Sequence, residues 1–82
     1  METKTQNVES KVKAILTERF GLTAEPTMDV RLKDMGADSL DAVEILMDCE
    51  KEFGVRIPEE VQENIETVGD IVRTFENKLL EL

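Results

Sequence analysis

Residues 34–41 read Asp-Met-Gly-Ala-Asp-Ser-Leu-Asp and join a glycine-containing loop to the start of an amphipathic helix. Gly36 gives the backbone the freedom to end the loop, and apolar residues recur at helical spacing after Ser39. Asp38 or Ser39 is therefore expected to cap this helix. A hydroxyl at Ser39 would be exposed among backbone N–H groups that lack intrahelical partners, and such groups favour a phosphate ester. The stretch thus predicts a helix cap or a point of covalent attachment at Ser39.

The helix itself is expected from about Ser39 to Phe53, and on a helical wheel it carries two apolar stripes. The inward stripe consists of Ala42, Ile45, Leu46, Cys49 and Phe53. The opposite stripe consists of Leu40, Val43 and Met47, flanked by Asp41, Glu44 and Asp48. Apolar anchors inside an acidic frame are typical of a helix that binds other proteins. For Leu40, packing against the loop or the neighbouring short helix is an equally open alternative.

The segment before residue 38 predicts a first helix and a long connection. The helix is expected from about Gln6 to Phe20, with Thr3 or Thr5 as its cap and Gly21 at its end. Its apolar stripe consists of Val8, Val12, Ile15 and Leu16. Residues 22–37 form a connection that is long for a small domain, so some of it should be buried. Its expected anchors are Leu22, Met28, Val30, Leu32 and Met35.

The C-terminal third predicts a short helix and a longer one. Residues 55–57 are expected to form a buried extended link, followed by a helix from about Glu59 to Asn64 after Pro58. Its expected anchors are Val61 and Ile65. Thr67 and Asp70 suit a capping box before the last helix. The core stripe of that helix consists of Val68, Ile71, Val72, Phe75 and Leu79. The predicted fold is all-α: a small four-helix bundle with three longer helices, one short one and a long first loop, as a single domain over residues 1–82.

The composition argues against several kinds of catalytic and metal site. The chain has 82 residues, one cysteine and no histidine, so an internal disulfide and a Cys/His zinc site are excluded, and we expect no metal site. Ser39 has no histidine base, and Ala37 and Asp41 occupy the glycine places of the serine-hydrolase motif. Cys49, on the inward stripe, is expected to be a small core residue. No apolar run reaches membrane-spanning length, and we expect a cytoplasmic monomer without membrane insertion.

The negative charge is concentrated around the proposed site. The net charge is -9, and residues 38–66 hold ten acidic and two basic residues. Such a field repels nucleic acid and attracts basic protein surfaces, although a merely solubilising role is the alternative. Mutual repulsion among these acids also predicts that salt or divalent cations stabilise the protein. By the same reasoning, neutralising Glu44 and Asp48 should raise its thermal midpoint.

Residues 34–41, followed by Val43-Glu44 and by residues 52–58, resemble the acyl carrier protein family at its prosthetic-group site. The resemblance extends from about Val8 to Leu79. In that family the serine of Asp-Ser-Leu carries 4'-phosphopantetheine, which implies that Ser39 is the modified residue. The resemblance also implies that Asp38 and Asp41 help a phosphopantetheinyl transferase to engage. The acyl groups would be presented to fatty-acid synthesis enzymes that have basic docking surfaces. The docking residues so implied are Leu40, Asp41, Val43, Glu44, Met47 and Asp48.

Two alternatives remain at this stage. Met35 replaces a usual leucine, Lys33 stands where an acid is common, and Arg31 stands where an apolar residue is often found. A carrier for a specialised polyketide or lipid pathway is therefore the alternative within the family. An unmodified acidic helical adaptor, which uses Ser39 only as a cap, is the alternative from a different class.

Overall fold

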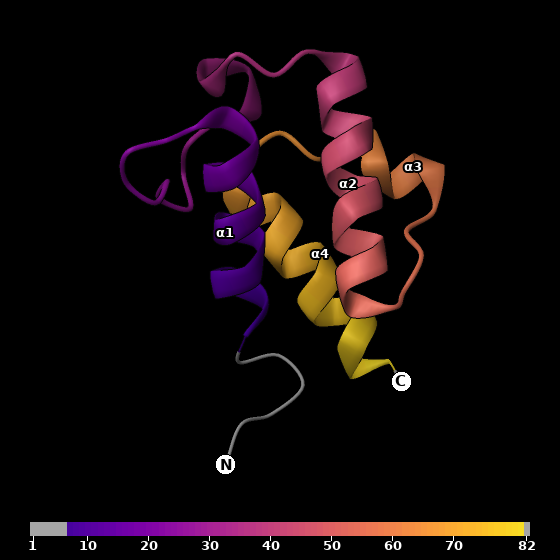
Figure 1. Ribbon diagram of the computed structural model, residues 1–82. Coiled ribbons are helices and arrows are strands. Elements are labelled where there is room, and N and C mark those ends of the chain that lie inside the picture. Colours follow the sequence, from indigo (N-terminus) through magenta and orange to yellow (C-terminus); the bar gives the residue numbers. More distant parts are fainter. Residues whose placement is uncertain (1–6, 82) are drawn as a thin grey trace.

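The computed structural model describes residues 7–81, which contain four α-helices and one 3-10 helix and no β-strand (Figure 1). The elements in order are α1 (Val8–Phe20), η1 (Leu32–Met35), α2 (Ser39–Phe53), α3 (Glu59–Gln62) and α4 (Val68–Leu80). The predicted all-α fold, with three longer helices and a short one, is confirmed. The bounds of α2 agree with the prediction. Gln6, Thr3 and Thr5, the predicted start and caps of the first helix, lie outside the described residues.

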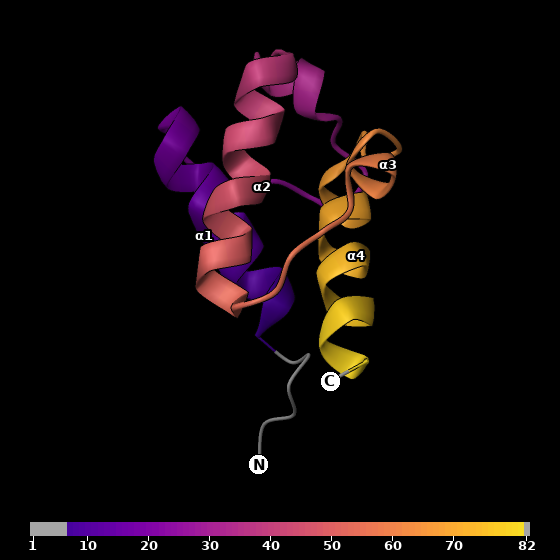
Figure 2. The same ribbon diagram turned by 90° about the vertical axis from the view of Figure 1, so that its right-hand side faces the viewer.

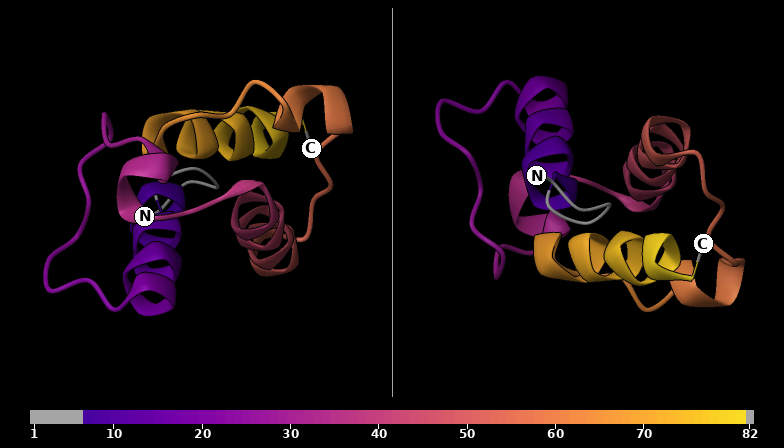
Figure 3. Two further views of the ribbon diagram at one scale, coloured as in Figure 1. Left: turned by 90° about the horizontal axis from the view of Figure 1, so that it is seen from above. Right: turned by 90° about the horizontal axis from the view of Figure 1, so that it is seen from below.

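The helices are arranged with α4 against both α1 and α2. In Figure 1, α1 and α2 run in opposite directions, and views from above and below show α4 crossing the pair (Figure 3). Figure 2 shows α3 beside α4 and on the far side of the molecule from α1. This arrangement leaves one long side of α2 exposed between α1 and α3. That exposed side is the one that the sequence predicts for partner contact.

The core consists of the apolar stripes that the sequence predicts. Most of their residues are buried, and Ile15, Ala42 and Phe53 are partly buried against the core. The rings of Phe53 and Phe75 lie 5.3 Å apart between centroids, which joins the end of α2 to α4. The buried set is Val8, Val12 and Leu16 of α1, Ile45, Leu46 and Cys49 of α2, and Val68, Ile71, Val72, Phe75 and Leu79 of α4. Apolar burial of this kind is the main favourable term for a small bundle.

The long connection is pinned to the start of α4 by backbone hydrogen bonds. The N–H of Leu32 donates to the carbonyl of Glu66 at 2.9 Å, and the N–H of Val68 donates to the carbonyl of Val30 at 3.0 Å. Gly69 donates to the carbonyl of Met28 at 2.8 Å, a close approach that its missing side chain permits. Of the predicted anchors, Leu32 is buried and the others, Leu22, Met28, Val30 and Met35, are partly buried. The connection therefore holds the start of α2 at a defined place.

The α3 helix is shorter than predicted, and one of its two predicted anchors is wrong. The helix ends at Gln62 rather than Asn64, and Val61 is 38% exposed, whereas Ile65 is partly buried. The buried link residue Ile57 anchors α3 instead, because the side-chain amide of Gln62 donates to its carbonyl at 2.9 Å. A helix of one turn buries only the side that its neighbours cover. Val61 lies on the uncovered side.

Candidate functional site

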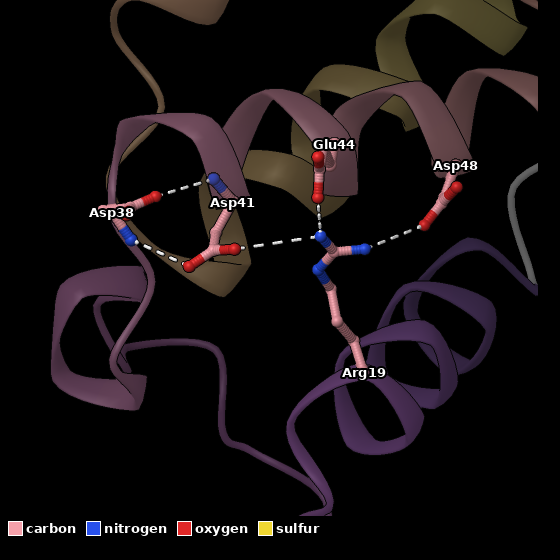
Figure 4. Close-up of polar contacts among 5 residues, drawn as sticks. All are labelled: Arg19, Asp38, Asp41, Glu44 and Asp48. Atoms are coloured by element: carbon pink, nitrogen blue, oxygen red, sulfur yellow. Dashed lines mark hydrogen bonds and ion pairs between the residues drawn. The ribbon is translucent and has the colours of Figure 1, made fainter.

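The N-terminus of α2 is capped by Asp38 rather than by Ser39. The Asp38 backbone is extended, and its carboxylate accepts a hydrogen bond from the N–H of Asp41 at 2.9 Å. The Asp41 carboxylate in turn accepts from the N–H of Asp38 at 3.2 Å, which completes a capping box (Figure 4). Asp38 was one of the two predicted caps. The other, Ser39, has no structural role as a cap.

The side chain of Ser39 is exposed on the first turn of α2, and its hydroxyl makes no hydrogen bond within residues 7–81. Backbone N–H groups of a first helical turn lack intrahelical acceptors and carry partial positive charge. A phosphate on the Ser39 oxygen would therefore lie in a favourable field without breaking an existing contact. The position suits a covalent attachment.

A groove between α2 and α3 begins at Ser39. Its first part has a volume of about 320 Å³ and is lined by Ser39, Ala42, Val43, Leu46, Glu59, Gln62 and Glu63. A more open part of about 650 Å³ shares Val43, Glu59 and Gln62 with it and continues to Arg56 and Ile57. The groove has apolar residues from α2 and glutamates from α3 along its rim. A flexible arm fixed to Ser39 could lie along it, so the residues present fit a covalent prosthetic group.

The outward stripe of α2 is exposed as the sequence predicts. Leu40 is 65% exposed, Met47 50% and Val43 44%. Leu40 is also absent from the partly buried side chains that pack against the core, so its exposure favours partner contact over internal packing. A contiguous apolar surface beside an acidic one is the usual composition of a protein-binding face.

One residue of this face comes from α1 and was missed by the sequence analysis. The guanidinium of Arg19 lies among the carboxylates of α2 (Figure 4). It contacts Glu44 directly, and its nitrogens lie 3.8 Å from Asp41 and 3.5 Å from Asp48. About two turns earlier on α1, Lys11 pairs with Glu52 of α2 at 3.2 Å. The spacing of Lys11 and Arg19 in the sequence could have indicated that both bases lie on α1. It could not have indicated that they contact carboxylates of α2.

The comparisons with known proteins agree with this geometry. A family model described as "Phosphopantetheine attachment site" matches residues 10–75. A curated acyl carrier protein from Thermotoga maritima is 46% identical over 76 residues, which cover 90% of this chain and 94% of that protein. The chain belongs to the acyl carrier protein family.

Solved structures of acyl carrier proteins share the fold. A crystal structure of an acyl carrier protein from Thermotoga maritima matches with a TM-score of 0.81 and 28% identity, covering 98% of this chain and 95% of that one. The solution structure of the acetyl actinorhodin acyl carrier protein from Streptomyces coelicolor matches with a TM-score of 0.73 and 26% identity, covering 96% and 98%. As a member of this family, the chain is a carrier and not an enzyme, and its prosthetic group is 4'-phosphopantetheine. The resemblance read from the sequence is confirmed.

The acidic residues of this acyl carrier differ in how they are paired. Four acidic residues of α2 face bases of α1. Asp41, Glu44 and Asp48 lie around Arg19, and Glu52 pairs with Lys11. Within residues 7–81, Glu59, Glu60 and Glu63 of the α3 region are exposed and form no ion pair. Glu59 and Glu63 therefore bring unpaired negative charge to the α3 side of the groove. The sequence alone located the excess negative charge only as far as residues 38–66.

Cys49 lies inside the core and has no part in the chemistry of the carrier. Its side chain is fully buried and unpaired in a disulfide. Burial, with the neighbouring charges of Asp48, Glu50 and Glu52, raises the pKa of the Cys49 thiol to about 12. The thiol is therefore protonated at neutral pH and a poor nucleophile, as the sequence predicts.

No helix within the described part of the chain has the length and apolar character needed to cross a bilayer.

Proposed function

We propose that Ser39 is the attachment residue for 4'-phosphopantetheine and that this chain carries acyl groups in fatty acid biosynthesis. The observation that supports it most is the Ser39 hydroxyl, exposed and without a hydrogen bond within residues 7–81, at the mouth of the groove between α2 and α3. Ser10, the only other serine in the sequence, lies on α1 and does not line this groove. The terminal thiol of the arm supplies the chemistry, because it holds acyl groups as thioesters.

The residues around Ser39 have separate roles in this proposal. Asp38 fixes the first turn of α2, so that the hydroxyl is presented to a phosphopantetheinyl transferase in a constant orientation. Asp41 contributes to the same cap, and together they offer carboxylates to the metal or basic residues of the transferase. Ala42 and Leu46 give the groove an apolar floor, which would shelter the arm and its acyl group from water.

The outward face of α2 is the proposed docking surface for enzymes. It consists of Leu40, Asp41, Val43, Glu44, Met47 and Asp48. Exposed apolar side chains would supply contact area, and the carboxylates would steer basic partner surfaces and set the association rate. The proposed partners are the phosphopantetheinyl transferase and acyl-processing enzymes, not nucleic acid. We further propose that the carrier acts in the cytoplasm as a monomer with a single domain.

The attachment site is tested by intact-mass measurement after incubation with coenzyme A and a promiscuous phosphopantetheinyl transferase. Wild type should gain the mass of one phosphopantetheinyl group, and Ser39→Ala should gain none. Ser10→Ala is the matched control and should be modified as wild type is. Modification of Ser39→Ala at any other residue would show that the assignment is wrong.

The pathway is a separate question, because Arg31 and Lys33 depart from the usual family pattern and both line a pocket of about 230 Å³ behind the start of α2. A carrier for a specialised polyketide pathway is therefore the second candidate, and a similar fold occurs in the actinorhodin carrier. The loaded protein should be tested with purified fatty-acid elongation, reduction and dehydration enzymes. Successively longer saturated acyl groups would support the fatty acid role, and failure at the first reduction would favour the polyketide role.

A further inference from the structure

Arg19 occupies a position on the docking face that a partner would also seek. Its side chain is 26% exposed and reaches from α1 across to α2, where it meets Asp41, Glu44 and Asp48 (Figure 4). These three carboxylates belong to the surface proposed to attract basic partners. An arginine or lysine from a docking enzyme would therefore approach a row of carboxylates that already holds a guanidinium.

We infer that Arg19 is a specificity-determining residue of the docking face, because it must be displaced before a basic side chain of a partner can pair fully with Asp41, Glu44 and Asp48. The inference rests on the proposed docking role of α2. The partner chemistry that it selects is a planar guanidinium or several clustered cations. An isolated lysine, a single hydrated point charge, competes less well for carboxylates that an arginine already contacts.

The geometry indicates that the displacement is feasible. Only Glu44 is in close contact, whereas the nitrogen–oxygen distances to Asp41 and Asp48 are 3.8 and 3.5 Å, beyond the usual hydrogen-bond range. A single guanidinium cannot form paired hydrogen bonds with three carboxylates at once. All three acids are partly exposed to solvent, where ion pairs contribute little to stability. Arg19 therefore weakens docking of basic partners without preventing it.

A groove next to Arg19 can receive its side chain when a partner displaces it. A groove of about 400 Å³ between α1 and α2 is lined by Ile15, Glu18, Arg19, Asp48 and Glu52. Glu18 is exposed and forms no ion pair within residues 7–81, so its carboxylate is available to the guanidinium once a partner displaces it. Arg19 can thus move along α1 and keep an acidic neighbour while a partner occupies its former position.

The test compares Arg19→Gln with wild type in the transferase reaction, with coenzyme A saturating and the carrier concentration varied. At low salt the KM for the carrier should fall by about two- to fivefold, as expected for removing one exposed ion-pair competitor. The difference should shrink at high salt, and the effect should be confined to KM. Lys11→Gln is the matched control, since it removes a cation that also joins α1 to α2 but pairs with Glu52, near the opposite end of α2 from Ser39. Its KM should equal that of wild type.

Two further variants separate the possible failures. Arg19→Lys keeps the charge and loses the planar fork, so its KM should lie between the values of wild type and Arg19→Gln. Glu44→Lys with Asp48→Lys should raise KM through loss of the acidic face. If that double variant leaves KM unchanged, the docking surface is wrong and this inference falls with it. If the double variant raises KM while Arg19→Gln leaves it unchanged or raises it, the inference alone is overturned.

Discussion

The carboxylate of Asp38 accepts a hydrogen bond from the backbone N–H of Asp41 at 2.9 Å, so the N-terminus of α2 is held by the residue before the proposed attachment serine. The reciprocal bond from the Asp38 N–H to the Asp41 carboxylate strengthens the same turn. Capping and attachment are therefore assigned to adjacent residues. One can be altered without the other, which makes both roles testable.

We predict that Asp38→Ala lowers the free energy of unfolding by about 1 kcal/mol, the usual effect of losing an N-cap side chain. Ser39→Ala should change it by less than about 0.5 kcal/mol, because the exposed hydroxyl has no partner to lose within residues 7–81. Urea unfolding followed by circular dichroism measures both values. Equal losses in the two variants would show that the serine also supports the helix start.

For the docking face, we predict that Glu44→Lys with Asp48→Lys slows acyl transfer between the loaded carrier and its enzymes at low salt. The loss should lie mainly in association and decrease as salt rises, because exposed charges are screened within about 10 Å at 0.1 M ionic strength. Stopped-flow or steady-state rates over a salt series measure this. The control Glu25→Lys with Glu76→Lys changes the net charge equally, on the loop after α1 and on α4. A similar loss in this control would mean that net charge alone is responsible.

The expected effect of the acidic cluster on stability changes once its ion pairs are known. Glu44→Gln with Asp48→Asn removes two partners of Arg19, so this pair of substitutions should not raise the thermal midpoint, contrary to the expectation from sequence.

Glu63 and Glu66 form no ion pair within residues 7–81. We predict that Glu63→Gln with Glu66→Gln raises the midpoint by about 2–4 °C at low salt, from reduced repulsion of a few tenths of a kcal/mol.

Calorimetry at low and high salt, with and without magnesium, measures these midpoints. The gain from the glutamine pair should disappear at high salt, because the repulsion that it relieves is already screened there. Among residues 7–81, no group of three or more acidic side chains is arranged to hold a metal ion. We therefore predict that magnesium raises the thermal midpoint no more than a simple salt does at the same ionic strength. A midpoint that rises more for the Glu44 and Asp48 variant would show that Arg19 does not compensate those charges.

We predict that the Cys49 thiol is unreactive in the folded protein. Its pKa is raised to about 12 from an ordinary value of 9.0, so the folded state favours the neutral thiol. That contribution to stability is fully present below about pH 9 and is lost as the pH rises from there toward 12. At pH 8, an aromatic disulfide reagent should react slowly with native protein and rapidly in urea. The Ser10→Cys variant is the control, and its added exposed thiol should react at once. If Cys49 of the native protein reacts as fast as that thiol, its burial is contradicted.

Much of this protein is determined by sequence at short range. The bounds of α2, its two opposite faces and the capping box at Thr67 depend on residues within about one or two turns of each other, and local spacing expresses them directly. The proposed attachment motif at Ser39 is local in the same sense. It could be found without knowing where any other helix lies.

Other features depend on contacts between segments far apart in the chain, and only the tertiary structure decided them. Arg19 meets Asp41 and Glu44 because α1 and α2 run side by side in opposite directions, which no local pattern specifies. Val61 is exposed because the link at Ile57, not α3 itself, contacts the core. Charge pairing and burial are properties of distance in space, and the packing of the helices sets those distances.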